Sequence, residues 1–302
     1  MQKGEHCVGD SSLIVIFLKN VKSHLPLRVL VLALSFHAVC FADDISASKP
    51  NSIGKSTSNE LAKGASIDLT SELSTPFQIA LVAPIQFARS DRSVAGLRID
   101  ILFGKNENTR GIDVGLVNYT SNDFGGLGFG LVNIVGHDAK GLDFGLVNYT
   151  SNDFWGLGFG SVNLVGHDGK GLQCGAFNWA KGDFAGIQSG ALVSVAEGSY
   201  HGIQGAFVSS TTGEFKGLQS SVISATNGEF TGWQNGWVTS YCGANFTGFQ
   251  SSGLVNVVKG TCTGVQIGLI NIADELKGIQ IGLFNENGKG PITLCPFINI
   301  GF

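Results

Sequence analysis

The stretch that decides the fold is GIDVGLVNYTSNDFGGLGFGLVNIVGHDAK (residues 111–140), followed at once by its near-copy GLDFGLVNYTSNDFWGLGFGSVNLVGHDGK (residues 141–170). Each copy contains the same short phrase twice, about 15 residues apart: a glycine, an aliphatic residue, a third residue that is usually polar, an apolar residue and often a second glycine. The phrase continues toward the end of the chain, with opening glycines Gly111, Gly126, Gly141, Gly156, Gly171, Gly186, Gly202, Gly217, Gly232, Gly248, Gly264 and Gly278. So regular a period predicts one supersecondary unit built repeatedly.

The repeats alternate with a period of two residues. Counted from the opening glycine as zero, positions +1, +3 and +5 are apolar in most copies, as in Leu142, Phe144 and Leu146. Position +2 is polar in most copies: Asp113 and Asp143, then Gln173, Gln188, Gln204, Gln219, Gln234, Gln250, Gln266 and Gln280. This alternation is typical of β-strands, and each glycine would cost a helix about 1 kcal/mol. The sequence therefore predicts an all-β fold.

Two architectures fit the strands, and the first is a repeat-built antiparallel up-and-down β-barrel of about 14–16 short strands. Two further strands are expected at Phe77–Phe87 and Val94–Phe103, and a short one at Ala65–Leu69. Turns of two kinds alternate along the chain, which suits the hairpins of an antiparallel meander and also a solenoid with two strands per coil. The strand count and the chain end carry the argument for the barrel. The end of the chain is apolar at alternate positions and finishes on Phe302, which is similar to the closing strand of outer-membrane barrels. These features favour the barrel.

The alternative is a β-solenoid of 15- or 30-residue coils. Position +3 becomes polar in the middle copies, at Ser189, Ser220, Asn235 and Ser251, where a barrel would face lipid. Parallel stacking would also align the eight consecutive glutamines into a hydrogen-bonded ladder. Trp233 and Trp237 suit a membrane girdle and a solenoid core equally well, so the alternative stays open.

The N-terminal region is typical of an exported protein. Basic residues precede the apolar run Val29–Phe36, and Ala42 lies before two aspartates. This order is that of a secretory signal peptide. We therefore expect a signal peptide at 1–42, a mobile leader rich in serine and asparagine at 43–75, and the repeat-built β domain at 76–302.

Charge and cysteine content add little. A net charge of −4 gives no basic footprint for nucleic acid. Cys242 and Cys262 are close enough in neighbouring repeats for a disulfide in an oxidising compartment. The plainer interpretation is that no bridge forms, and Cys174, which stands where other repeats carry Val, Phe, Ile or Ser, is a small apolar filling residue.

Few residues suggest a catalytic or metal-binding site. His137-Asp138 and His167-Asp168 recur as pairs and could form a metal or proton site, but duplication and the turn preference of Asp explain them better. The same applies to Asn122-Asp123 and Asn152-Asp153 as calcium ligands. The recurring asparagines are expected at strand ends, where Asn tolerates turn geometry: Asn118, Asn133, Asn148, Asn163, Asn178, Asn256, Asn271 and Asn285. We expect no catalytic, metal-binding or cofactor-binding residues, no cofactor, and no enzyme activity.

Several phrases carry a resemblance: GLVNYTSNDF (145–154), GVQIGLINIADELKGIQIGLFN (264–285), PFINIGF (296–302) and the lead-in VAGLRIDILFGKNENTRGIDVGLVN (94–118). Over residues 77–302 the chain resembles the glycine-rich surface repeat proteins of spirochaetes and chlamydia-related bacteria. The resemblance implies an envelope or surface location and no activity, substrate or catalytic residue.

The sequence as a whole predicts an exported, non-enzymatic cell-envelope protein of a Gram-negative-type bacterium, located in the outer membrane or at the cell surface. As a barrel it would form a pore or a surface wall. Its partners would be outer-membrane lipid and, through the strand ending at Phe302, the barrel-assembly machinery, with no nucleic acid. As a solenoid it would be a surface-tethered or secreted module for ligand binding or adhesion. The sequence does not determine an oligomeric state.

Overall fold

The computed structural model describes residues 74–83, 85–87 and 89–302. The expected signal peptide at 1–42, the leader except for its last two residues, and the strand at Ala65–Leu69 lie outside the described residues. The described residues form strands and turns without helix, and hence no helix long and apolar enough to span a membrane.

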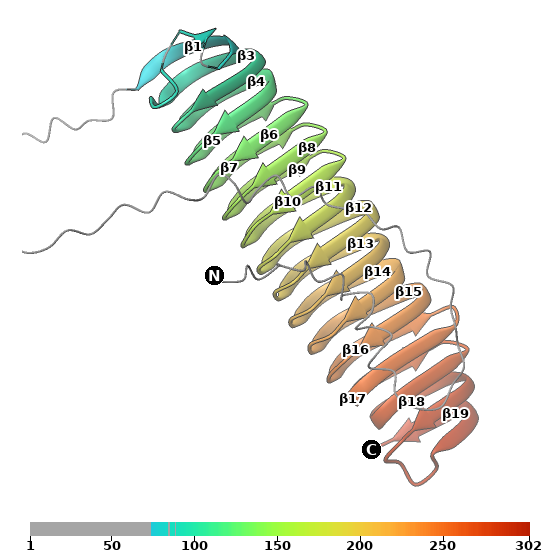
Figure 1. Ribbon diagram of the computed structural model, residues 1–302. Coiled ribbons are helices and arrows are strands. Elements are labelled where there is room, and N and C mark those ends of the chain that lie inside the picture. The colour runs from blue at the N-terminus through green and yellow to red at the C-terminus, as the bar shows by residue number, and fades with distance from the viewer. Residues whose placement is uncertain (1–73, 84, 88) are drawn as a thin grey trace, which may run out of the picture. The chain divides into compact units, whose positions relative to one another are not determined.

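The strands wind into a β-solenoid of about 14 turns, in which successive coils lie on one another (Figure 1). Nearly all neighbouring strands are parallel, and equivalent residues of successive coils face each other, as Gly217 faces Gly232. The strands are β1 (Thr75–Val82), β2 (Ile85–Gln86), β3 (Val94–Asn106), β4 (Thr109–Thr120), β5 (Phe124–Phe129), β6 (Val132–Val135), β7 (Ala139–Phe144), β8 (Val147–Thr150), β9 (Phe154–Phe159), β10 (Val162–Val165), β11 (Gly169–Ala180), β12 (Phe184–Ala196), β13 (Tyr200–Thr211), β14 (Phe215–Thr226), β15 (Phe230–Cys242), β16 (Phe246–Ser252), β17 (Val255–Ile267), β18 (Ile270–Asn287) and β19 (Leu294–Gly301).

The prediction of an antiparallel barrel is therefore wrong, and the solenoid alternative describes the fold. A barrel and a solenoid share the alternation of inward and outward residues, so the period of two does not distinguish them. The two kinds of turn do not point in opposite directions, because both lie on the same edge of the coil. Gly136 N, in one kind of turn, donates to Thr120 O, and Ser151 N, in the other kind, donates to Val135 O. Every coil of about 15 residues thus returns to its starting edge.

The opening glycine of each repeat is required by the stacking. Gly217 has a φ of 135°, a conformation that residues with a side chain rarely adopt. A Cβ placed on Gly217 would lie 2.0 Å from the carbonyl oxygen of Gly202 in the previous coil. Because the same relation recurs from coil to coil, the glycine column is what allows the backbones to approach this closely.

The interior of each coil is narrow and mixes aromatic and polar side chains. Phe184, Tyr200, Phe215, Phe230 and Phe246 are fully buried or nearly so and form one continuous stack. Their ring centroids are 4.8–5.4 Å apart and the rings are nearly parallel. This stack and the small residues opposite it form the apolar core of the described coils.

A ladder of glutamines runs beside the aromatic stack. Nε2 of each glutamine donates to Oε1 of the glutamine in the preceding coil, from Gln188 onto Gln173 at 3.0 Å through to Gln280 onto Gln266 at 2.7 Å. All eight side chains are buried. This ladder is what the solenoid alternative predicted. It satisfies the amides that burial would otherwise make costly.

The recurring asparagines form a second ladder, so their expected place at strand ends is wrong. Asn133 is buried, donates to Asn148 Oδ1 at 2.9 Å and also donates to the backbone oxygen of Phe144 at 3.0 Å. The same pattern recurs in Asn118, Asn148 and Asn163. The asparagine side-chain amides therefore stabilise, from inside the coil, the bend between its two halves.

The last strand does not close a barrel. β19 pairs antiparallel with β18, with Ile300 facing Ile279, and so covers the outer edge of the last coil. Ile298 and Ile300 are each 54% exposed, and Phe302 is also exposed. At the other end β1 pairs in parallel with β3, and β2 is antiparallel to β1. The apolar alternation before Phe302 therefore belongs to a capping strand.

The four cysteines of the described region are free thiols, so Cys242 and Cys262 are unpaired. Both are buried, with Cys262 stacked on Phe246 at the end of the aromatic column. Cys174 lies half-buried on an outer face. The disulfide considered between Cys242 and Cys262 is therefore absent, and Cys174, interpreted as a small apolar filling residue, lies outside the core.

Candidate functional site

The outer surface, rather than a pocket, is the candidate site, because it carries the apolar residues that a soluble fold usually buries. At the bend of most described coils stands a large apolar side chain that is 43–73% exposed. We call these residues the corner column: Leu116, Leu131, Leu146, Leu192, Phe207, Trp237, Leu254, Leu269 and Leu283. A parallel line at position +1, the first-face column, holds Ile112, Leu157, Ile187, Ile203, Trp233 and Ile279 at 38–49% exposure. Neither column contains a charged residue.

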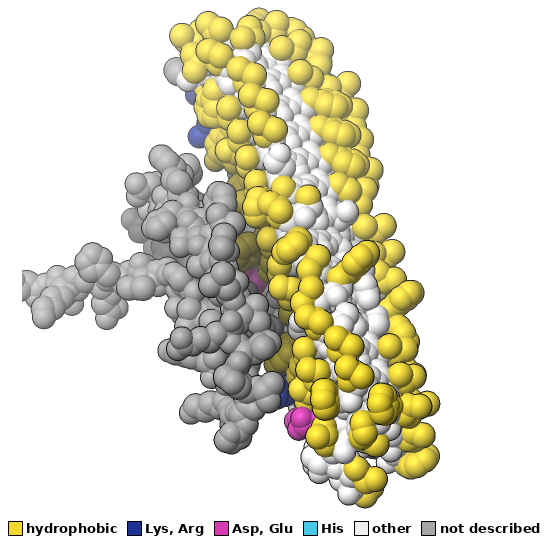
Figure 2. Space-filling view, turned by 90° about the vertical axis from the view of Figure 1, so that its right-hand side faces the viewer, with side chains coloured by type: hydrophobic (Ala, Val, Ile, Leu, Met, Phe, Trp, Pro, Cys, Tyr) yellow, Lys and Arg dark blue, Asp and Glu magenta, His cyan; other side chains and the backbone are white. Residues whose placement is uncertain are grey.

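The space-filling view shows the result (Figure 2). Hydrophobic side chains form two bands along the coils, separated by a band of other side chains and backbone. Monomeric soluble proteins rarely expose apolar patches larger than a few hundred Å². Apolar bands that continue from coil to coil over much of a stack of about 14 turns therefore make this surface the candidate interaction site.

Between the two columns the surface changes character in the middle coils. The +3 position is Phe129, Phe144 and Phe159 in earlier coils, and the stacked rings there are 4.9–5.4 Å apart. In the following coils it becomes Cys174, Ser189, Gly205, Ser220, Asn235 and Ser251. Asn235 donates to Ser220 Oγ at 3.3 Å, and Ser251 donates to Asn235 Oδ1 at 2.8 Å. The middle coils therefore present a polar floor between apolar side chains.

Trp233 and Trp237 lie beside this floor. They are 49% and 73% exposed, so they form neither a core nor a closed girdle. Trp233 packs edge-on against Phe249 of the next coil, with ring centroids 5.8 Å apart. Farther toward the N-terminal end, Trp155 is 53% exposed and lies between the ammonium groups of Lys140 and Lys170, at 5.1 and 5.5 Å.

A column of carboxylates follows the turn edge, which we call the acidic rim: Asp123, Asp138, Asp153, Asp168 and Asp183. Each accepts the backbone N–H of the equivalent residue one coil later, as Asp168 does from Asp183 N at 2.8 Å. Strand pairing stops at the turns, and there the aspartate side chain accepts a hydrogen bond from the backbone of the next coil. This explains why aspartate recurs in both kinds of turn.

The two histidine pairs extend the acidic rim. His137 Nδ1 lies 2.8 Å from Asp123 Oδ1, and His167 Nδ1 lies 2.7 Å from Asp153 Oδ1. The hydrogen bond with Asp153, followed by the charge of Asp168, raises the pKa of His167. The hydrogen bond with Asp123 likewise raises that of His137.

Each histidine, the aspartate that follows it and the aspartate one coil earlier keep one ligand atom apiece within 4.8 Å of one another. In geometry each group could hold a cation, but every group is exposed or half-exposed. The histidines and aspartates also already satisfy one another. Asn122 and Asn152 join the same rim, with Asn152 Nδ2 2.6 Å from Asp138 Oδ1.

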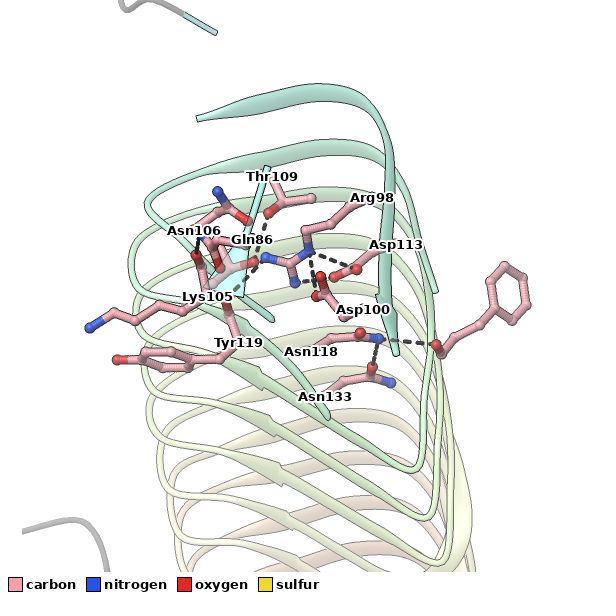
Figure 3. A network of polar contacts seen from close by, with 12 residues as sticks. Gln86, Arg98, Asp100, Lys105, Asn106, Thr109, Asp113, Asn118, Tyr119 and Asn133 are labelled. Carbon is pink, nitrogen blue, oxygen red and sulfur yellow. Dashed lines mark hydrogen bonds and ion pairs between the residues drawn. The ribbon is translucent and has the colours of Figure 1, made fainter. Parts of the chain in front are cut away.

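The interior of the first coils holds charges that sequence reasoning missed (Figure 3). Arg98 is fully buried and donates to both carboxylate oxygens of Asp113, through Nε at 2.7 Å and through Nη2. Its Nε is also 3.1 Å from Asp100 Oδ2. Burial, with Asp113 nearby and against the pull of Arg98, raises the pKa of Asp100 to about 7. The signal lay in the +2 column, where Arg98 and Asp113 precede the glutamines.

Comparison with known proteins adds no assignment: no family model, no curated protein and no solved structure matches this chain. The resemblance to the glycine-rich surface repeat proteins stays a prediction, as does the absence of enzyme activity.

Proposed function

We propose that this chain is an exported, non-enzymatic cell-envelope protein whose β-solenoid binds an apolar partner along its outer columns, and that the partner is lipid of the outer membrane. The observation that carries the proposal is the corner column, in which a large, uncharged side chain stands exposed at most bends. Covering such side chains contributes roughly 25 cal/mol per Å² of apolar area removed from water.

The dimensions favour a solenoid lying along a membrane surface. About 14 turns at a strand spacing of about 4.8 Å make a stack of roughly 65 Å, about twice the 30 Å hydrocarbon thickness of a bilayer. Trp155 between Lys140 and Lys170 has the composition of an interfacial anchor, with an amphipathic ring flanked by cations. A solenoid lying flat would place many corner side chains against lipid at once.

Flotation with lipid vesicles tests this function. The chain without its expected signal peptide would be mixed with phosphatidylethanolamine vesicles, with and without phosphatidylglycerol, and centrifuged through a density gradient. We expect it to float with both kinds of vesicle. Leu131→Gln and Leu146→Gln should each weaken binding by roughly tenfold, because each removes a buried leucine from the contact.

The matched control is Ser151→Gln, which adds the same side chain on the turn edge and should bind as the wild type does. Protein that stays at the bottom of the gradient, or corner variants that float like the control, would refute lipid as the partner. Cell fractionation checks the location independently, since the proposal requires the chain in the envelope fraction.

The polar floor of the middle coils supports a second candidate, a ligand-binding or adhesion module for a linear polysaccharide. A sugar chain has apolar faces that pack on aromatic rings and hydroxyls that bond to polar groups. Trp233, Trp237 and the floor at Ser220 and Ser251 offer both. Quenching of tryptophan fluorescence by cell-wall polysaccharide, lost in Trp237→Ala, would favour this candidate over lipid.

A further inference from the structure

The column of buried residues that continues the glutamine ladder toward the N-terminal end is interrupted twice by glycine. In order along the coils it consists of Arg98, Asp113, Gly128, Asp143, Gly158 and then Gln173. Gly128 therefore leaves space between two inward-facing aspartates, in a column that is filled by glutamine side chains from Gln173 onward.

Asp143 is the unusual member of this column. It is 3% exposed, and its carboxylate has no hydrogen bond or ion pair within the described residues. The carboxylate leans toward the gap, since a Cβ placed on Gly128 would lie 2.6 Å from Asp143 Oδ1. A buried carboxylate without a partner is costly, so its position requires an explanation.

A cavity of about 10 Å³ lies at this gap, lined by Asp113, Asn118, Thr120, Asn133 and Asp143 among others. Its volume corresponds to about one water molecule or one ion. The amide nitrogens of the two asparagines already donate within the second ladder, whereas Asn118 Oδ1 is buried without a partner. The polar groups left for the cavity are therefore mainly oxygen acceptors.

The charges around the cavity do not balance. The buried groups are one guanidinium, Arg98, and three carboxylates, Asp100, Asp113 and Asp143, which carry a net charge of −2 when ionised. Arg98 is committed to Asp113 and Asp100 and makes no contact with Asp143. One divalent cation beside Asp143 would neutralise the group.

We propose that the interior of the solenoid holds one calcium ion between Asp113 and Asp143, in the space that Gly128 leaves. The ligand atoms are the oxygens of the two carboxylates, and oxygen ligands are those that calcium takes. Zinc and copper favour nitrogen and sulfur ligands. Magnesium demands near-ideal octahedral geometry, whereas calcium accepts a flexible arrangement of oxygens. The site lies inside the stack, so refolding in calcium gives the ion access to it while the coils form.

The test is the metal content of refolded protein. The chain without its signal peptide would be refolded in calcium or in EDTA, desalted into metal-free buffer and measured by mass spectrometry of the metals. Protein refolded in calcium should retain about one calcium per chain and should melt several degrees above protein refolded in EDTA, because the bound ion stabilises only the folded state.

Two variants assign the ion to this site. Asp143→Asn removes the unpartnered charge with little change in shape, and Gly128→Ala fills the gap without changing any charge. Each should lower the retained calcium at least about tenfold and abolish the calcium-dependent rise in melting temperature. Asp138→Asn, which alters the acidic rim beside His137, is the control and should retain the ion.

The outcomes are distinguishable. Calcium retained by the wild type and by Asp143→Asn alike, or lost from Asp138→Asn alone, would place the ion at the rim and refute the proposal. No retained calcium in the wild type would show that protons neutralise the cluster, and this too would refute it. If Gly128→Ala does not fold, Asp143→Asn decides alone. None of these results depends on lipid binding.

Discussion

Gln234 Nε2 donates a hydrogen bond to Gln219 Oε1 across 2.9 Å, one coil away. The same nitrogen also donates to Tyr241 O at 2.9 Å, and Gln234 Oε1 accepts from Gln250 at 2.8 Å. Gln234→Ala would break all three contacts, leave two buried amides short of a partner and open a cavity. We expect a loss of about 2–4 kcal/mol in the free energy of unfolding.

Urea-induced unfolding measures this loss. Thr231→Ala lies on the outside of the same coil and serves as the control, with an expected change below about 0.5 kcal/mol. Equal stability of the two variants would mean that the ladder contributes no net stability.

The glycine column gives a second prediction with an internal control. Gly217→Ala places a Cβ 2.0 Å from Gly202 O on a backbone with a φ of 135°. We expect it to destabilise the protein by several kcal/mol or to prevent folding. Gly205→Ala, three residues after the preceding opening glycine Gly202, meets its nearest neighbour at 3.3 Å and should cost less than about 1 kcal/mol. Circular dichroism and thermal unfolding would compare the two variants.

The histidines of the acidic rim predict a pH effect. Since pairing with aspartate raises the pKa of His137 and His167, their contribution to stability is fully present below the unfolded pKa of 6.5 and is lost as the pH rises through the folded values. Imidazole NMR signals should titrate above pH 6.5. Asp153→Asn should lower the pKa of His167, whereas the distant Asp91→Asn should leave both histidines unchanged. An unaltered His167 in Asp153→Asn would contradict the pairing.

Thiol labelling tests the burial of the cysteines. Burial raises the pKa of Cys242 to about 11 and that of Cys262 to about 12, so few thiolates form at pH 8. A maleimide should therefore modify Cys174 and Cys295 in the native protein and reach the other two only after denaturation. Mass spectrometry of the labelled peptides would show the order. Rapid native labelling of Cys262 would contradict its place in the core.

The sequence predicted the repeating β-strand unit correctly, but the preferred arrangement of the strands, an antiparallel barrel, was wrong. The strands and their inward polar face, at Gln188 or Gln219, follow from the alternation of side chains between the two faces of a strand. The backbone imposes this alternation in a barrel and in a solenoid alike. What separates the two is whether residue 217 pairs with residue 232 in parallel or across a hairpin, and this depends on where the chain turns. The terminal Phe302 favoured the barrel because a capping strand and a closing strand share the same apolar alternation.

The interior charges and the asparagine ladder could have been predicted only in part. Asn118 and Asn133 recur at a fixed position, but recurrence does not show whether a side chain points inward after a bend. Arg98, Asp113 and Asp143 occupy the +2 column, so their burial could have been inferred from the solenoid alternative, which places Gln173 and its successors inside. The cavity at Gly128 could not be predicted from the sequence, because it depends on how far the Asp143 carboxylate reaches toward the neighbouring coil.

Residues 111–140 and 141–170 continue one in-register stack, so the length of the molecule is set by the number of such blocks. Inserting another such 30-residue block would lengthen the stack by about 10 Å, two coil spacings, and leave its width and the order of its faces unchanged. Length can therefore change through duplication alone. A copy of residues 111–140 would bring two more corner side chains and two more rim aspartates, so contact area and length would increase together.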